Sequence, residues 1–329
     1  MRSIANTNDA AASPLVSIIL SCYNSEKYLA ETLASVRIQS YQNWELIAVN
    51  DCSTDTTQDI LRCAASTDPR IKHIERKTRG GKPSITKNTG LDHAKGQYIA
   101  FLDHDDLYLP AKIEELVTAL ELNKNCVAAF HDLEYIDAQS QASGQRYLPN
   151  FIKEADEFLT PIGNDTYICS ERFFVFQTLR YSAMQTTGCL IAKERLPPGS
   201  IVFNTDYTIV DDKDLWIRLS LLGNLLYRDC VLARYRVHEG NLSKNGLQLH
   251  IDLANFFENN ILRVQKRLTS TESAAMKQQL ATVFSQLGWA MRVANRHQEA
   301  RAAYVKSIKI KPSLAALLAY CKAGMQPRV

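Results

Sequence analysis

The sequence lacks any long apolar run. Its first residues, MRSIANTNDAAASP, contain no apolar stretch of the kind that signal peptides carry. No window approaches the roughly 20 apolar residues that a membrane-spanning helix needs. We therefore expect a cytoplasmic protein that is at most peripheral at the inner face of the cell membrane.

Strong charge of one sign is also missing. The net charge is +3 and the pI is near 8.3. So mild a balance argues against a nucleic-acid partner and against membrane binding through bulk electrostatics. An anionic partner would have to be met by a local group of basic residues.

Paired cysteines are missing as well. The eight cysteines are scattered along the 329 residues, and no two are spaced as C-x-x-C. This pattern favours reduced thiols over a disulfide framework and argues against a structural zinc site. The 46% hydrophobic share is enough for one large core or two modest ones.

Short apolar runs alternate with amphipathic stretches after a small, polar tail at residues 1–13. The expected strands cover residues 15–22, 44–49, 71–76 and 98–102, and the expected helices cover 25–39, 56–66 and 85–94. The first helix is expected to be capped by Asn24 or Ser25. Strands that alternate with helices predict an α/β fold with a mostly parallel central sheet and helices on both faces.

Three of these strands end in polar clusters. The clusters are SCYN at 21–24, NDCSTD at 50–55 and DHDD at 103–106. Ligands of such sheets bind beyond the carboxyl ends of the strands. We therefore expect the three clusters to converge on one rim.

The third cluster crowds acids together. Asp103 and Asp105, at i and i+2 of an extended segment, suit Mg²⁺ or Mn²⁺ shared with a diphosphate. His104 is expected to point the other way. Asp106 is expected to cap the following helix, and capping is also the alternative explanation for the cluster as a whole.

The second cluster and the loop after it allow two interpretations each. Asp51 and Asp55 suit turn formation, yet Asp51 after a strand can also bond a ribose hydroxyl or a base edge. The basic loop residues face either a phosphate or solvent, and they are Lys77, Arg79, Lys82 and Lys87. Neither a P-loop spacing nor G-x-G-x-x-G is present.

A further acidic group, DDKD at 211–214, opens an expected helix. These acids either complement the helix dipole or include a general base for a substrate hydroxyl. His238, after another strand-like run, is either a packing residue or a nitrogen ligand for the same metal.

Regular patterns fade between residues 138 and 181 and become helical after 247. The aromatic middle segment is expected to form adaptable binding loops. In the tail, residues at tetratricopeptide offsets predict one such unit at about 281–314, and they are Phe284, Leu287, Gly288, Ala300, Tyr304 and Pro312. One unit cannot bury its own face, so it must dock on the main domain, on a partner, or on flanking helices near 250–270 and 313–322.

The order of these motifs resembles the glycosyltransferase family 2 enzymes of GT-A fold. The resemblance rests on VSIILSCYN and NDCSTD, then KNTGLDHAKGQYIAFLDHDD, then DDKDLWIRL and YRVHEGNLS. It covers residues 15 to 243. It implies a catalytic domain at 14–246, followed by the helical region at 247–329. It also implies a nucleotide-diphospho-sugar donor, most often a UDP-sugar, and a divalent metal ion, Mn²⁺ or Mg²⁺. The reaction would invert the configuration at the anomeric carbon.

The resemblance also assigns residues. The positions expected to contact the nucleotide-sugar are Ser21, Tyr23, Asn24, Asp51, Lys82, Asn88 and Asp103. Asp103 and Asp105 form the D-x-D pair, with Asp105 the direct metal ligand, and His238 matches the late histidine of the metal site. Asp212 matches the catalytic aspartate of the family's Glu-Asp pair.

Three positions depart from the family pattern. Cys52 stands where glycine is common, Lys87 where arginine is common, and Asp211 where glutamate is common. Because Asp211 and Asp212 are chemically alike, either of them could be the base.

The expected function is a metal-dependent, inverting glycosyltransferase of bacterial cell-surface polysaccharide or lipopolysaccharide synthesis. Its acceptor would be a glycan or a lipid-linked molecule, and the helical tail would contact a membrane or another protein. One alternative is a non-catalytic sugar-nucleotide or protein-binding module that uses the tail. Another is a nucleotidyltransferase, which would need a glycine-rich basic first loop that SCYNSEKYL does not supply.

Overall fold

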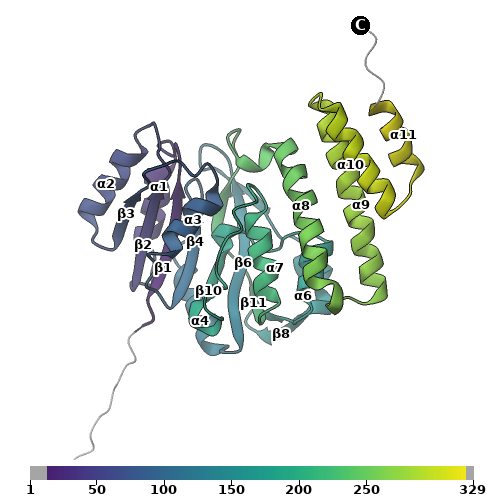
Figure 1. Cartoon of the computed structure of the whole chain (residues 1–329). Coiled ribbons are helices and arrows are strands. Elements are labelled where there is room, and N and C mark those ends of the chain that lie inside the picture. Colours follow the sequence, from purple (N-terminus) through teal and green to yellow (C-terminus); the bar gives the residue numbers. More distant parts are fainter. Residues whose placement is uncertain (1–12, 324–329) are drawn as a thin grey trace, which may run out of the picture.

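The computed structural model describes residues 13–323, which form one large sheet flanked by helices and a helical C-terminal region (Figure 1). The strand order is β3-β2-β1-β4-β10-β6-β11-β9-β8, with β5 beside β11 and β7 beside β6. The strands are β1 (Val16–Cys22), β2 (Trp44–Asn50), β3 (Ile71–Glu75), β4 (Tyr98–Asp103), β5 (Leu107–Tyr108), β6 (Cys126–Ile136), β7 (Ala142–Arg146), β8 (Leu159–Gly163), β9 (Thr166–Cys169), β10 (Cys189–Ala192) and β11 (Asn224–Arg236).

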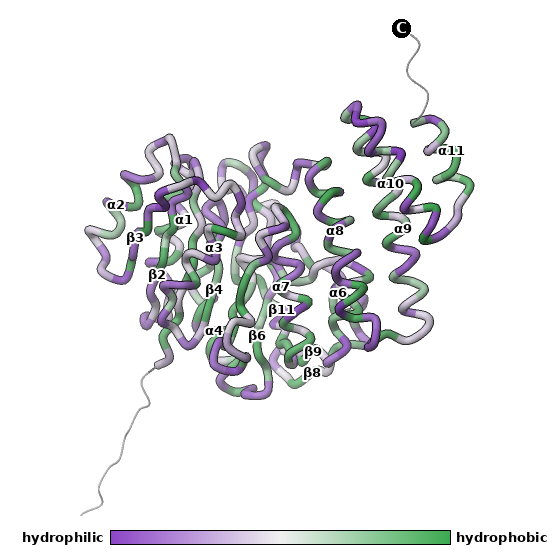
Figure 2. The backbone as a smooth tube through the Cα atoms, in the orientation of Figure 1, coloured by the Kyte–Doolittle hydropathy of each residue, from purple (hydrophilic) through white to green (hydrophobic). Residues whose placement is uncertain are grey.

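Helices cover both faces of the sheet and continue beyond it. They are α1 (Leu29–Arg37), α2 (Thr57–Thr67), α3 (Pro83–Leu91), α4 (Lys112–Leu122), α5 (Phe151–Glu154), α6 (Phe173–Leu179), α7 (Asp211–Ser220), α8 (Gly246–Val264), α9 (Ser270–Val293), α10 (His297–Ile310) and α11 (Leu314–Ala323). Figure 2 shows the sheet strands largely in green, as expected for strands buried on both faces. The predicted α/β fold class is confirmed.

The N-terminal half of the sheet is parallel, as predicted. β1 pairs in parallel with β2 and β4, and β2 pairs in parallel with β3. Every residue of β1 and β2 is buried. Their polar ends therefore share one edge of the sheet, because parallel strands all point the same way.

The other half is mixed. β10 lies antiparallel between β4 and β6, β11 runs parallel to β6, and β9 and β8 follow as antiparallel strands. The prediction of a mostly parallel sheet is therefore correct for the N-terminal half only. The antiparallel strands β10, β8 and β9 have only four or five residues each, too few to show a sequence pattern.

The first helix begins at Leu29, later than predicted, and neither Asn24 nor Ser25 caps it. The Ser25 hydroxyl instead accepts from Tyr23 N. Asn24 adopts a positive φ of 47° and its amide oxygen accepts from Thr54 N. Both residues shape the turn after β1, so the helix starts one turn further on.

The aromatic segment at 138–181 was predicted wrongly as adaptable loops. Its phenylalanines instead form part of a buried core. Phe151 lies 4.6 Å from Tyr227 between ring centroids, and Phe173 stacks on Phe176 at 5.5 Å. Aromatic pairs at these separations stabilise a fixed arrangement.

The C-terminal helices pack on the sheet domain and on one another. Phe256 and Phe257 of α8 share a buried cluster with Tyr207 and Ile217. α9 and α10 meet closely at Gly288, where a Cβ atom would lie 2.8 Å from the Tyr304 ring. Phe284 of α9 also joins the buried cluster that contains Phe174 of α6 and Phe256 of α8. The pair therefore packs on both the main domain and a flanking helix, two of the three possibilities. The tetratricopeptide assignment and the domain boundary near 246 stay predictions.

None of the helices between residues 13 and 323 combines the length and the hydropathy that spanning a bilayer requires.

Candidate active site

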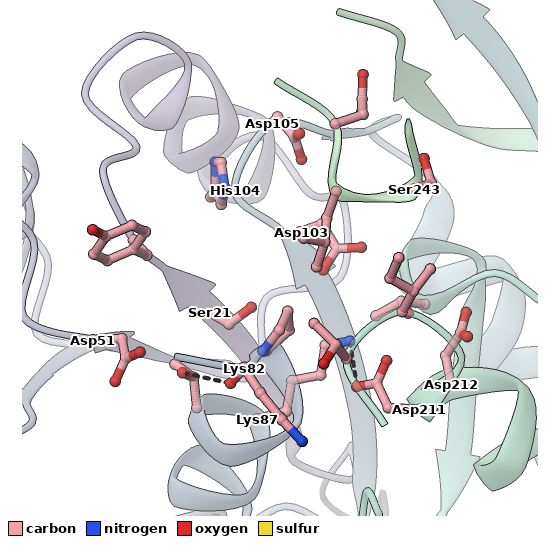
Figure 3. A pocket seen from close by; sticks show the side chains of 18 of the residues that line it. Ser21, Asp51, Lys82, Lys87, Asp103, His104, Asp105, Asp211, Asp212 and Ser243 are labelled. Carbon is pink, nitrogen blue, oxygen red and sulfur yellow. Dashed lines mark hydrogen bonds and ion pairs between the residues drawn. The ribbon is translucent and has the colours of Figure 1, made fainter. Parts of the chain in front are cut away.

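The polar ends of β1, β2 and β4 surround a cavity of about 420 Å³ (Figure 3). Ligand pockets in proteins commonly have volumes of this order. Most of the predicted site residues line it, and these are Ser21, Tyr23, Asp51, Lys82, Asp103, Asp105, Asp211 and Asp212. The convergence follows from the parallel register of the three strands.

Asp51 sits at the end of β2 and is almost fully buried. Its Oδ1 accepts from Gly80 N at 2.7 Å, its Oδ2 accepts from Gly81 N at 2.9 Å, and Arg76 Nε lies 2.9 Å from Oδ1. Two backbone hydrogen bonds and one ion pair therefore hold this carboxylate, while Arg76 Nε makes no hydrogen bond among the described residues. Asp51 thus holds the basic loop against the cavity.

Tyr23 and Arg79 form one wall of the cavity. The Arg79 guanidinium lies 4.0 Å from the centroid of the Tyr23 ring. A stacked aromatic and guanidinium pair offers a flat surface and a positive charge. Asn24, by contrast, is exposed and bonded to the turn after β2, so the structure does not bring it into the cavity lining.

Lys82 and Asn88 both bond to the loop before α7. Lys82 Nζ donates to the carbonyls of Thr205 at 2.7 Å and Asp206 at 3.1 Å. Asn88 makes two reciprocal bonds of 2.8 Å with the backbone of Phe203. Lys82 lines the cavity with its amine turned to these carbonyls, whereas Asn88 lies outside the lining and fixes the loop.

Asp103 and Asp105 both face the cavity, as Figure 3 shows. Burial raises the pKa of Asp103, Lys87 opposes that shift, and the neighbouring Asp105 carboxylate adds to it. His104 was predicted to point away, yet it also lines the cavity, and its buried Nδ1 has no hydrogen-bond partner among the described residues. The chain turns directly after β4, so strict alternation of side chains does not hold there.

Asp106 does not cap a helix, so that prediction was wrong. It is buried, its Oδ2 accepts from Thr187 Oγ1 at 2.5 Å, and its Oδ1 accepts from Arg236 N at 3.0 Å. The next helix, α4, begins at Lys112 without a side-chain cap. Asp106 therefore fastens the acidic turn to β11.

Arg236 is a positioning residue that the sequence interpretation missed. Its side chain is fully buried, and Nε donates to the Asp105 carbonyl at 2.7 Å. Its NH2 group lies 2.7 Å from Glu31 Oε2. Its position two residues before His238 is the only signal in the sequence, and its contacts with Asp105 and Glu31 are visible only in the fold.

His238 lies beside Asp105, with Nε2 at 2.9 Å from Oδ2. Carboxylate oxygen and imidazole nitrogen are suitable ligands for Mn²⁺. Within residues 13–323, no group of three or more His, Cys, Asp or Glu residues is arranged to hold a metal ion. Asp105 and His238 therefore offer one carboxylate and one imidazole at this position, and His238 itself lies outside the cavity lining.

The two acids at the start of α7 have different surroundings. Asp211 Oδ2 lies 3.3 Å from Lys87 Nζ, and both side chains are buried. Burial by itself would lower the pKa of Lys87. The negative charges of Asp211 and Asp103 have the larger effect and raise that pKa, so the amine stays charged. Asp212 has no cationic partner in contact, and burial, with the nearby Asp211 charge, raises its pKa to about 7. This difference distinguishes two residues that are alike in sequence.

Replacing Lys87 with Met is expected to lower the free energy of unfolding by about 3 kcal/mol, because Asp211 would keep a buried charge with no counter-ion. Urea denaturation measures this. The same substitution at exposed Lys95 is the control and is expected to change stability by less than about 0.5 kcal/mol. Equal stability of the two variants would contradict the assigned ion pair.

Several lining residues were not predicted. They are Gln185, Thr186, Thr208, Ile209, Tyr235 and residues 240–243. Asp252 of α8 holds two of them, since its Oδ2 accepts from Thr208 N at 2.6 Å and Ile209 N at 2.7 Å. Tyr235 and residues 240–243 lie within YRVHEGNLS, a stretch on which the family resemblance rests, whereas no motif marks the other four positions.

The sequence pattern of the family described as Glycosyl transferase family 2 matches residues 17–182. An uncharacterized glycosyltransferase of Haemophilus influenzae is 32% identical over 231 residues, which are 70% of this chain and 68% of that protein. The putative teichuronic acid biosynthesis glycosyltransferase TuaG of Bacillus subtilis is 38% identical over 117 residues, which are 36% of this chain and 46% of TuaG.

Two solved structures share the fold. S. aureus TarS 1–349 in complex with UDP-GlcNAc matches with a TM-score of 0.63 and 16% identity, over 94% of this chain and 88% of that one. The mannosyltransferase PcManGT of Pyrobaculum calidifontis, in complex with GDP-Man and Mn²⁺, matches with a TM-score of 0.57 and 21% identity, over 95% and 81%.

Proposed function

The chain belongs to glycosyl transferase family 2 and is therefore a glycosyltransferase, and from this premise we propose that it is metal-dependent and inverting. Its donor is a nucleotide-diphospho-sugar, with a UDP-sugar favoured, and its acceptor is a hydroxyl group of a glycan or a lipid-linked molecule. The observation that carries this proposal is one cavity lined by Asp103 and Asp105 together with Asp212.

In this mechanism Asp212 is the general base. It takes the proton from the acceptor hydroxyl as the oxygen attacks the anomeric carbon, and the nucleoside diphosphate leaves from the opposite side. Lys87 forms an ion pair with Asp211, whereas Asp212 has no such partner and can accept the proton.

The donor would be held by the other end of the cavity. Asp105 and His238 would hold the metal ion, which supplies positive charge for the diphosphate leaving group. Asp103 and Asp51 each offer a carboxylate for ribose or base contacts. The stacked pair of Tyr23 and Arg79 offers a flat, positively charged wall for the nucleotide.

Similar proteins support the donor and the setting. The TarS and PcManGT structures contain UDP-GlcNAc and GDP-Man respectively, and the second contains Mn²⁺. TuaG is named for teichuronic acid biosynthesis. These likenesses favour a nucleotide-sugar donor and a role in bacterial cell-surface polysaccharide synthesis.

Turnover is expected to rise with pH and to reach half of its maximum near pH 7. Below about pH 7 the Asp212 carboxyl is protonated and cannot accept the acceptor's proton, and above that pH it can. Release of nucleoside diphosphate across a pH series measures this.

In the Asp211→Asn variant the rise is expected to move to lower pH, because a negative charge that raises the pKa of Asp212 is gone. The exposed Asp206→Asn variant should leave the profile unchanged. A turnover that is flat or falls through pH 7 would contradict the assignment of the base.

A thermal-shift screen of UDP-, GDP- and dTDP-sugars, each with and without Mn²⁺, tests the donor. One class should raise the melting temperature more than the others, and only with Mn²⁺ present, because a ligand that binds the folded state stabilises it. Slow release of nucleoside diphosphate from that donor would identify an enzyme, because a non-catalytic binding module would not cleave the donor. Stabilisation without any release would favour the module.

A further inference from the structure

Helix α11 carries an apolar stripe on its solvent side. Leu314, Leu317 and Leu318 are 73%, 49% and 52% exposed, and Cys321 is also exposed. These positions follow at i, i+3, i+4 and i+7, a spacing that places them on one face of a helix. The helix is attached through small residues, since Ala316 and Ala323 are buried. Figure 2 shows green along this outermost helix.

Positive charge is concentrated in the same region. Residues 246–323 contain 11 Lys and Arg against four Asp and Glu, whereas residues 1–245 contain 26 against 31. The mild net charge of the whole chain therefore conceals a basic helical region beside a slightly acidic sheet domain.

The four acids of the helical region are already engaged. Asp252 accepts two backbone bonds, and the other three pair with basic side chains, namely Glu258 with Lys306, Glu272 with Arg172, and Glu299 with Arg296. Several exposed cations, in contrast, have no acidic partner within residues 13–323, and they are Arg292, Lys309, Lys311 and Lys322. Lys309 and Lys311 precede α11 and Lys322 lies in its last turn, so uncompensated lysines stand at both ends of the leucine stripe.

We propose that α11 docks on an anionic lipid bilayer, with the leucine stripe at the level of the acyl chains and the flanking lysines at the phosphates. Exposed leucines can enter the level of the acyl chains, and lysines at both ends of the helix are attracted to anionic phosphates, so the two contributions add. The proposal does not depend on the donor or on the reaction.

A second copy of the chain fits this surface less well. A two-fold contact places the same patch on both partners, so the unpaired lysines would face one another. Stable protein interfaces also bury about 20–30 residues on each side, far more than this four-residue stripe. A bilayer has neither restriction, because it supplies negative charge and accepts a small apolar insertion.

The docking would also orient the cavity. In Figure 1 the chain enters β1 from the lower side, so the carboxyl ends of β1, β2 and β4 lie at the upper side, toward which α10 and α11 also extend. A bilayer on that side would bring the cavity rim near a lipid-linked acceptor, a consequence that does rest on the proposed function.

Vesicle flotation of the full chain tests the docking, with vesicles of phosphatidylcholine alone and vesicles with about one part phosphatidylglycerol to three parts phosphatidylcholine. The wild type should bind the anionic vesicles at least about tenfold more tightly than the neutral ones, and added salt should weaken that binding. The Leu317→Glu/Leu318→Glu variant should lose about tenfold or more. Charge reversal in Lys309→Glu/Lys311→Glu/Lys322→Glu should remove the preference for anionic vesicles.

Leu122→Glu provides the matched control, since Leu122 is 79% exposed at the end of α4 and should not affect binding. Far-UV circular dichroism and the melting temperature verify that each variant folds. Equal binding of the wild type to both kinds of vesicle would overturn the proposal, as would unchanged binding by the leucine variant. Loss of self-association in that variant, with vesicle binding intact, would assign the stripe to a second copy instead.

Discussion

The Asp212→Asn variant is expected to lose about 10²–10⁴-fold in turnover while its donor affinity stays within a factor of about two of the wild type. The amide has nearly the same shape as the carboxylate but cannot accept the proton of the acceptor hydroxyl. Asp212 makes no ion pair, and its one described bond is from Lys213 N at 2.6 Å to Oδ1, which the amide oxygen can still accept. Donor titration by calorimetry and steady-state turnover separate the two effects.

Two further variants make this result specific. Asp206→Asn changes an exposed acid just before α7 and should behave like the wild type. Asp211→Asn removes the partner of Lys87 and should reduce stability, since it leaves a buried amine unpaired. If Asp211→Asn abolished turnover at full stability while Asp212→Asn remained active, the base would be Asp211.

The Asp105→Ala variant is expected to lose about 10²–10³-fold in kcat/KM and to lose its response to added Mn²⁺. Neutralising charge on a diphosphate leaving group contributes several kcal/mol to a transition state, and each 1.36 kcal/mol corresponds to about tenfold in rate. Asp105 is the carboxylate that lies 2.9 Å from His238, and the pair supplies the oxygen and nitrogen ligands of the proposed site. Activity measured in a Mn²⁺ series, after treatment with a chelator, reports both effects.

Asp59→Ala is the control for this experiment, because Asp59 is an acid whose side chain is 77% exposed on α2. It should keep both its activity and its Mn²⁺ response. An Asp105→Ala variant with the Mn²⁺ response of the wild type would show that the ion binds elsewhere or is not needed.

The positions of the carboxylates at the sheet edge could be predicted from the sequence for a physical reason. The last part of each of β1, β2 and β4 is an apolar run, so each strand end is visible as an abrupt change to polar residues. Parallel pairing then brings Ser21, Asp51 and Asp103 to the same edge without further information. The directions of His104 and Asp106 were wrong because the chain turns there, and Asn24 bonds to the turn after β2 instead of lining the cavity.

The remaining parts of the site depend on contacts between distant segments. Asp211 and Asp212 differ only because Lys87, 124 positions away from Asp211, pairs with one of them. Asn88 bonds to the backbone of Phe203 and Asp252 to that of Thr208, and a backbone acceptor or donor leaves no trace in a sequence pattern. Short antiparallel strands such as β8 and β9 likewise have too few residues to show a period.

The proposed mechanism is tested most directly by the release of nucleoside diphosphate from the donor that stabilises the protein most, followed with Mn²⁺ and then with a chelator. Release by the wild type is expected to require the metal, to rise through pH 7 and to be lost in Asp212→Asn. Release that continues at the same rate in the chelator and in the Asp212→Asn variant would contradict it.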